Sequence, residues 1–273
     1  AFRTGIPPER AKTFTVGAKN RFLNNKVQLN GAAYYYDYEN VQVMASGLRS
    51  NEGIYEDEVV DADGNPVDLN DNNIYGEDVL IVGGGPGGYE DPWAQFQYGQ
   101  FRTIGVDISM DWIITTKDRI NFTVTYLDSE WSDCKINAYL KKLDSDGNVV
   151  KYWEGDGMDY KGLTRTFSPK YTTNLGYEHN FILGAFGTLV PHVDIMYKTH
   201  YVLSFLPSEY PLNYQESYYT VDGNIAFSHS SGKWSLNSYI KNATNYAAKT
   251  MYGMGGMSVT DPRTYGAVLS IRF

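Results

Sequence analysis

Apolar and polar residues alternate along most of this chain, with the period of two that is typical of β-strands. In one segment, Ile104, Val106 and Ile108 alternate with Asp107 and Ser109. The same pattern predicts about nine strands, which begin near residues 12, 27, 104, 120, 171, 193, 219, 234 and 265. The chain is therefore expected to belong to the all-β class.

Two kinds of connection join these strands, and they alternate along the chain. Short polar turns are expected near residues 22–25, 115–118, 181–187 and 230–233. Long irregular segments are expected near residues 46–95, 132–165, 206–214 and 244–262. Strict alternation of this kind is the pattern of outer-membrane β-barrels, in which short turns face the periplasm and long loops are extracellular.

The polar face of the predicted strands carries charge, at Asp107, Asp111, Asp194, Lys198 and Arg272. A soluble β-sandwich tolerates such residues only where that face is solvated, whereas the lumen of a barrel is polar. Tyrosines also cluster near strand ends, in segments 34–38 and 214–219, where the aromatic girdles of a barrel lie. We therefore predict a transmembrane antiparallel β-barrel, with a soluble β-rich binding protein as the alternative.

The composition of the 273 residues narrows the possible functions. No apolar run approaches the roughly 18 residues that a membrane helix needs, so a helical membrane protein is excluded. The mean hydropathy of −0.41 is compatible with a barrel, because lipid-facing and lumen-facing residues cancel in any window average. The net charge of −9 argues against a nucleic-acid partner, since binding to phosphates requires a surplus of Lys and Arg.

The C-terminal segment forms one predicted strand whose apolar face ends on an aromatic residue. Tyr265, Leu269, Ile271 and Phe273 lie on this face. An exposed ring at the end of a soluble strand gains nothing, because chain ends fray. The face is therefore expected to contact hydrocarbon, with Tyr265 near the outer girdle and Phe273 near the periplasmic end.

The number of predicted strands bears on how much of a barrel this chain contains. Bacterial single-chain barrels have an even number of strands. If the last strand runs toward the periplasm, counting back about nine strands makes the first strand run the same way. The whole chain, residues 1–273, is therefore expected to be the C-terminal portion of a larger barrel.

Several segments resemble, in the expected order, the strands of TonB-dependent outer-membrane receptors. Segments 8–19, 29–43 and 168–177 resemble strands from the middle of that family's barrel. Segment 239–245 resembles the penultimate strand. Segment 261–273 resembles the last strand, with Pro-Arg before Tyr-Gly and with Arg-Phe at its end.

The resemblance implies a 22-stranded barrel with a plugged lumen, in which the plug domain and the TonB-contacting segment lie outside this chain. It also implies an active transporter, energised by the TonB complex through that missing segment, that takes up a scarce nutrient too large for porins. A ferric siderophore is the expected ligand, with cobalamin, an oligosaccharide or a peptide as alternatives. A passive porin or adhesin barrel is the alternative of another class.

The resemblance further implies which molecules surround this part of the receptor. Outer-membrane lipid and lipopolysaccharide are expected around the barrel, and a small-molecule nutrient among its loops. The barrel-assembly machinery is expected to read the face formed by Tyr265, Leu269, Ile271 and Phe273.

Five aromatic residues are the candidates for ligand contact. Tyr34 and Tyr36 lie on the face opposite Leu29 and are expected to point into the lumen near the outer rim. Trp93, Tyr152 and Trp153 lie in long loops, where they either stack on a ligand or pack their own loop.

Two acidic segments resemble calcium loops at first sight, with the carboxylates Asp61 and Asp63 in one and Asp144 and Asp146 in the other. An EF-hand loop has Gly at its sixth position and a bidentate Glu at its twelfth, whereas here Gly is fourth and that Glu is missing. Both segments are better hairpin turns, in which Gly adopts a positive φ. We predict no metal, no cofactor and no catalysis, and we interpret the single Cys134 as a lone thiol.

Deletion of Phe273 tests the role of the final strand. Because its ring closes the face that is expected to serve as the assembly signal, the truncated receptor should insert poorly while any inserted molecules still bind ligand. The measurement is the amount of full-length receptor in isolated outer membranes beside its ligand affinity. Assembly of the truncated receptor at normal levels would contradict this role.

Overall fold

The computed structural model describes residues 8–46, 54–55, 65–66, 80–81, 89–90, 94–143, 149–204, 213–253 and 256–273. These residues form antiparallel strands together with one short 3₁₀ helix, η2 (Gly184–Phe186). Among them, no helix is long and apolar enough to cross a membrane. The predicted all-β class is confirmed.

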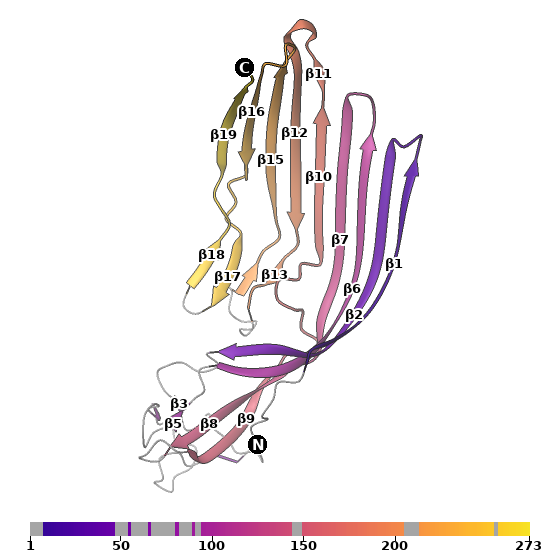
Figure 1. Cartoon of the computed structure of the whole chain (residues 1–273). Helices are drawn as coiled ribbons and strands as arrows, with labels where there is room; N and C mark the ends of the chain where they lie inside the picture. Colours follow the sequence, from indigo (N-terminus) through magenta and orange to yellow (C-terminus); the bar gives the residue numbers. More distant parts are fainter. Residues whose placement is uncertain are drawn as a thin grey trace. The chain divides into compact units, whose positions relative to one another are not determined.

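One large sheet contains the predicted strands (Figure 1). In order across the sheet, they are β1 (Arg10–Phe22), β2 (Val27–Ser46), β6 (Ala94–Ile113), β7 (Asp118–Asp133), β10 (Tyr171–His179), β12 (Gly187–Lys198), β15 (Tyr218–His229), β16 (Trp234–Lys241) and β19 (Thr264–Ile271). A short strand, β11 (Phe181–Ile182), pairs with β12. The order across the sheet follows the order along the chain, so the described strands form an open, up-and-down sheet.

Small hairpins occupy the long segments that the sequence pattern left irregular. They are β3 (Ile54–Tyr55) with β4 (Leu80–Ile81), β5 (Tyr89–Glu90) with β8 (Lys135–Leu143) and β9 (Val149–Asp159), β13 (Tyr201–Val202) with β14 (Tyr214–Gln215), and β17 (Lys249–Gly253) with β18 (Gly256–Val259). The antiparallel pairing of β8 with β9 confirms the predicted hairpin, although residues 144–148 lie outside the described residues. Most of residues 251–260, inside the expected long segment 244–262, belong to the β17–β18 hairpin, which the sequence pattern does not reveal.

The chain divides into two compact units. Unit 1 comprises residues 1–11, 37–101 and 130–163. Unit 2 comprises residues 12–36, 102–129 and 164–273, and it contains the short turns of the sheet.

In unit 2 the alternation of the sequence sorts side chains onto two faces of the sheet. Leu175 of β10 lies opposite Ile195 of β12, and Leu236 of β16 lies opposite Leu269 of β19. The exposed fractions of Leu175, Ile195 and Leu269 are 45%, 41% and 57%. Aliphatic side chains in the middle of a sheet are covered in soluble proteins, so this exposed apolar face fits a hydrocarbon environment. We call it the outward face.

Aromatic residues mark both ends of the outward face. At the long-loop end, Tyr126 pairs with Tyr171, with ring centroids 5.3 Å apart, and Tyr197 pairs with Tyr219. At the short-turn end, Trp112 and Trp234 occupy the corresponding positions of β6 and β16. Tyr265 begins β19 at the long-loop end and pairs with Ile240. These two bands correspond to the aromatic girdles of membrane barrels.

Unit 1 has a core of the kind found in soluble proteins. Trp131 of β7 is only 2% exposed, and its ring meets Phe101 of β6 edge-on, with centroids 5.8 Å apart. Tyr38 of β2 stacks on Phe101, with ring centroids 4.6 Å apart. Because a Cβ at Gly99 would lie 2.7 Å from the Trp131 ring, only glycine leaves room for this indole.

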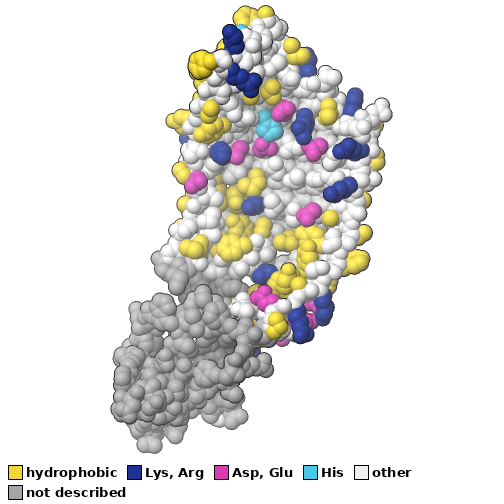
Figure 2. Space-filling model, in the orientation of Figure 1, with side chains coloured by type: hydrophobic (Ala, Val, Ile, Leu, Met, Phe, Trp, Pro, Cys, Tyr) yellow, Lys and Arg dark blue, Asp and Glu magenta, His cyan; other side chains and the backbone are white. Residues whose placement is uncertain are grey.

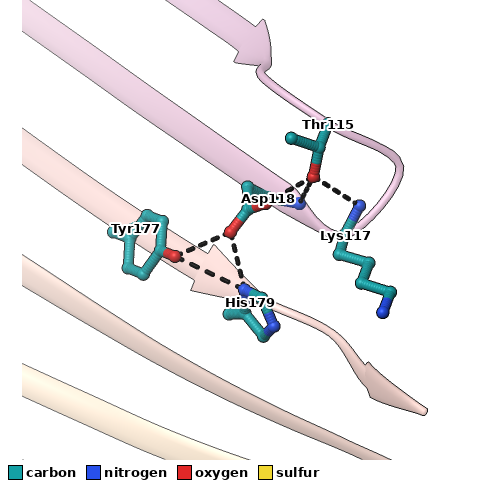
Figure 3. A network of polar contacts seen from close by, with 5 residues as sticks. All are labelled: Thr115, Lys117, Asp118, Tyr177 and His179. Carbon is teal, nitrogen blue, oxygen red and sulfur yellow. Dashed lines mark hydrogen bonds and ion pairs between the residues drawn. The ribbon is translucent and has the colours of Figure 1, made fainter.

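A polar network closes the short turn between β6 and β7 (Figure 3). The carboxylate of Asp118 accepts a hydrogen bond from the hydroxyl of Thr115 and one of 2.8 Å from the hydroxyl of Tyr177. Its Oδ1 lies 2.6 Å from Nδ1 of His179. The backbone N–H groups of Lys117 and Asp118 donate to Thr115 Oγ1. The turn is therefore tied to the neighbouring strand β10.

Apart from the β6–β7 turn, the closest approach of two backbones in the short turns is at Gly187, where η2 passes into β12. Its φ is +124°, and a Cβ there would overlap the carbonyl oxygen of Ser228. Gly232, in the β15–β16 turn, also has a positive φ of +68°, but a Cβ there would have no neighbour within 4 Å. Both glycines have a positive φ, but a side chain would overlap a neighbouring strand only at Gly187. A comparison of the two positions therefore distinguishes the cost of the backbone conformation from the cost of steric overlap.

Substitution of these glycines tests the close approach. Gly187→Ala should lower the free energy of unfolding by about 1–3 kcal/mol more than Gly232→Ala, because only the former forces two backbones apart. The measurement is urea unfolding of the full-length receptor in detergent, followed by its heat-modifiable mobility on gels. Equal losses in the two variants would show that the positive φ alone accounts for the cost.

Candidate functional site

The face of the unit 2 sheet opposite the outward face carries a row of ionisable side chains, and we call it the polar face. Asp111 and Arg119 form an ion pair at 2.8 Å. His192 lies 3.8 Å from Glu178 and 2.6 Å from Asp194, on β10 and β12. Figure 2 shows acidic, basic and histidine side chains on the sheet face that is turned to the viewer. In a barrel this face lines the lumen.

Hydrogen bonds between neighbouring strands continue this row. Asn174 donates to Asp194 at 3.4 Å, and Thr125 donates to Asp107 at 2.7 Å. Gly176 of β10 lies between Asn121 of β7 and Asp194 of β12, and a Cβ there would overlap the side-chain amide of Asn121. The polar face is therefore a connected surface of hydrogen-bonding groups that suits water and polar ligands.

Tyr34 lies on the polar face, as the sequence predicts, and packs over Gly105. A Cβ on Gly105 would overlap the Tyr34 ring, so the ring fills the space that the glycine leaves. Tyr36 lies beside it, with ring centroids 5.1 Å apart. Tyr34 thus has a structural role in covering a glycine of the sheet, and contact of either ring with a ligand stays a prediction.

At the long-loop end of unit 2, two loops pack against each other around buried side chains. Tyr201, Leu203, Tyr218 and Ala248 form this cluster and are 1–8% exposed. They come from the connection between β12 and β15, with the start of β15, and from the loop between β16 and β19. The Tyr218 ring stacks on Tyr246 at 5.1 Å, with an interplanar angle of 6°.

Gln215 joins the two loops by hydrogen bonds. It is 1% exposed, and its Nε2 donates to the hydroxyl of Tyr246 at 3.1 Å. Its Oε1 accepts from the backbone N–H of Lys249, whose Nζ in turn donates to Tyr214 O at 2.6 Å. Buried polar groups satisfied in this way fix one arrangement of the chain.

Hydrogen bonds of Asn242 fix the start of the loop between β16 and β19. Its φ is +48°, a conformation that Asn tolerates better than most residues. Its Nδ2 donates to Tyr246 O at 2.9 Å and to Asp261 O at 3.0 Å, while its Oδ1 accepts from Tyr246 N. We call the described parts of these two loops the loop pair; hydrogen bonds and buried side chains join them at the long-loop end of unit 2.

Cys134 is a buried thiol of unit 1. It is 2% exposed, and burial raises the pKa of its thiol to about 11. Burial likewise raises the pKa of the neighbouring Tyr160 to about 12. Since only the thiolate is nucleophilic, this position favours packing over chemistry.

The remaining predicted site residues are only partly described. Trp93, Asp61, Asp63, Asp144 and Asp146 lie outside the described residues. Tyr152 and Trp153 lie in β9, opposite Lys141 and Leu140 of β8. Among the described residues, no group of three or more His, Cys, Asp or Glu side chains is arranged to hold a metal ion.

The sequence predicts the charged polar face, but it does not predict the contacts between its side chains or the loop pair. The alternation places Asp194 on the polar face, but it does not show that Glu178 of β10 lies directly opposite His192 of β12. That neighbour depends on strand register, which period-two patterns leave open. The burial of Gln215 could not be predicted, because a single polar residue in a loop is ordinarily solvated.

Comparison with solved structures shows that the fold is that of siderophore receptors. The ferric yersiniabactin uptake receptor FyuA from Yersinia pestis superimposes with a TM-score of 0.60 and 14% identity, over 97% of this chain and 30% of that one. The siderophore receptor PiuA from Acinetobacter baumannii gives 0.59 and 18%, over 97% and 28%. The ferric-catecholate import receptor Fiu from E. coli K12 gives 0.58 and 15%, over 98% and 28%.

This chain thus spans less than a third of the length of the receptors it resembles. None of the curated proteins matches it in sequence. A family model described as the β-barrel of TonB-dependent receptor-like proteins matches residues 2–243. The chain therefore belongs to the TonB-dependent receptor family, as part of a β-barrel of the bacterial outer membrane.

Proposed function

We propose that this chain is the C-terminal portion of a TonB-energised transporter that imports a ferric siderophore across the outer membrane. The observation that carries the proposal is the fold match to receptors that are named for siderophore or ferric-chelate uptake. A barrel wall with an apolar outward face and a polar inner face accords with it. In this proposal the remaining strands of a 22-stranded barrel, the plug and the TonB-contacting segment belong to the rest of the receptor.

In this proposal the two faces of unit 2 have different tasks. The outward face holds the barrel in lipid and lipopolysaccharide, and the barrel-assembly machinery reads its last strand, β19. The polar face lines the path of the ligand and meets the plug, with the row from Asp111 to Asp194 as its charged part. The short turns face the periplasm, and the long segments near 46–95, 132–165, 206–214 and 244–262 are extracellular.

The loop pair would form one stiff side of the ligand entrance. Preorganised loops lower the entropy that is lost on binding, and Gln215 and Asn242 supply that order here. Exposed methionine side chains on this part of the molecule, Met251 and Met257, offer apolar contact to a large ligand. The chain provides binding and a path, and no catalysis.

A gene deletion tests the proposed transport. The deletion strain should lose growth on one or a few ferric siderophores among a panel of iron chelates, cobalamin, oligosaccharides and peptides. Removal of TonB in the intact strain should abolish the same uptake, measured with radiolabelled iron. Uptake that persists without TonB would instead identify a passive porin, and loss of growth on a glycan or cobalamin would identify another substrate.

Substitution of Gln215 tests the loop pair. Gln215→Ala leaves the partly buried N–H of Lys249 without its partner, which costs at most about 1–3 kcal/mol. The half-saturation concentration for ligand uptake should therefore rise by roughly tenfold while the maximal rate is kept. Glu216→Ala, at the exposed neighbouring position, is the control and should change neither value. An unchanged half-saturation concentration in Gln215→Ala would remove the loop pair from ligand binding.

A further inference from the structure

A row of hydroxyl side chains crosses the polar face of unit 2 near the short turns. The strand registers place Thr188 of β12 opposite Ser228 of β15, Ser228 opposite Ser235 of β16, and Ser235 opposite Ser270 of β19. Thr188 is an even number of residues from Asp194 on the same strand, so the row lies on the polar face. We call these four residues the hydroxyl row; at the usual strand spacing it is about 14 Å long.

Two cations lie beside the hydroxyl row, on its short-turn side. The backbone N–H of Arg272 donates to Lys233 O at 2.7 Å, and alternation places both side chains on the face of the hydroxyl row. Both residues are exposed, and within the part of the chain that the structure describes neither takes part in an ion pair. Figure 2 shows Lys and Arg side chains toward this end of the face.

The acidic residues of the polar face lie farther from the short turns. On β12 and β15 the nearest carboxylates of this face are Asp194 and Asp222, which lie opposite each other. Each is six residues along its strand from the hydroxyl row, a distance of about 20 Å. The short-turn end of this part of the face is therefore basic, although the whole chain carries a net charge of −9.

Exposed apolar side chains flank the hydroxyl row on the same face. Ile182 of β11 lies opposite Thr188 and is 63% exposed. Val268 lies two residues from Ser270 on β19 and is 55% exposed. The lumen side of a membrane barrel is ordinarily polar. Apolar side chains grouped with cations and hydroxyls instead indicate a surface that another segment of protein covers.

The position of this surface limits what can cover it. Hydrocarbon meets the outward face of the sheet, whereas the hydroxyl row lies on the opposite face. In the proposed function that face is inside the barrel, where the rest of the receptor lies. That rest is large, because this chain spans only 28–30% of the three solved receptors compared above. A segment of the same receptor is therefore the partner that reaches this surface.

We propose that the hydroxyl row and its flanking residues dock an acidic segment from the part of the receptor that lies outside this chain. Carboxylates of that segment pair with Lys233 and Arg272, and its apolar side chains cover Ile182 and Val268. Its polar groups form hydrogen bonds with the hydroxyl row. Charge complementarity selects an acidic segment over a basic one. The inference rests on the proposed function, which takes the rest of the receptor to fill the lumen.

Photo-crosslinking in the full-length receptor tests this docking. A benzophenone amino acid replaces Ile182 in receptor that is assembled in the outer membrane of intact cells. After irradiation, mass spectrometry identifies the residues that position 182 has joined. The expected adduct joins it to an acid-rich segment of the same polypeptide. The matched control replaces Ile195, on the outward face, and should give no adduct with that segment.

Charge reversal tests the contribution of the two cations. Lys233→Glu combined with Arg272→Glu should lower the yield of the adduct at position 182 by about fivefold or more, because two attractions become repulsions. Lys26→Glu, which reverses a cation in the β1–β2 turn, should keep the yield. Heat-modifiable gel mobility shows whether each variant is folded. If the double variant does not fold, about 0.5 M NaCl on isolated outer membranes should lower the wild-type yield instead, because salt screens exposed charges.

Several outcomes would overturn the docking proposal. They are an adduct only with lipid or with a separate protein, an adduct with a segment that has no acidic residues, and a folded double variant with an unchanged yield. Absence of any adduct while uptake still requires TonB would reject the docking and keep the proposed transport. Absence of an adduct together with uptake that does not require TonB would reject both.

Discussion

Backbone hydrogen bonding between neighbouring strands is the constraint on which the rest of this structure depends. Hydrocarbon offers no partner for a peptide N–H or C=O, so a chain that crosses the membrane as strands must pair them in a fixed register. In β10 and β12 this register sets Leu175 against Ile195 and Gly176 against Asp194. A slip of one residue would turn Asp194 toward lipid and Ile195 toward the lumen, which the cost of placing a charge in hydrocarbon forbids.

The two units of the chain differ in their environment, and the burial of their side chains differs accordingly. In unit 2 the aliphatic residues of the outward face are exposed, while in unit 1 the ring of Trp131 is buried. The loop pair of unit 2 also has a buried cluster, fixed by Gln215. Segments outside the membrane thus build ordinary cores, and in the proposed function the core of the loop pair preorganises one side of the ligand entrance.

The sequence predicts the membrane strands well because period two persists over many residues and a slip would be costly. The predicted starts of β2, β10 and β16 are confirmed for this reason. Apart from the β8–β9 hairpin, whose Asp-Gly turn is recognisable, the loop hairpins were missed because strands such as β13 have only two residues, too few for a period to appear. The neighbours of Gln215 and the cover of Gly105 by Tyr34 depend on tertiary packing, which no local pattern encodes.

One face of the sheet meets hydrocarbon and the other meets water. Nitroxide labels at four consecutive positions of β12 test it most directly, with Val193→Cys, Asp194→Cys, Ile195→Cys and Met196→Cys in a Cys134→Ala background in proteoliposomes. Accessibility to oxygen should be high at 193 and 195, and accessibility to a water-soluble nickel chelate should be high at 194 and 196. Loss of this alternation, or its opposite phase, would show that the outward face does not meet hydrocarbon.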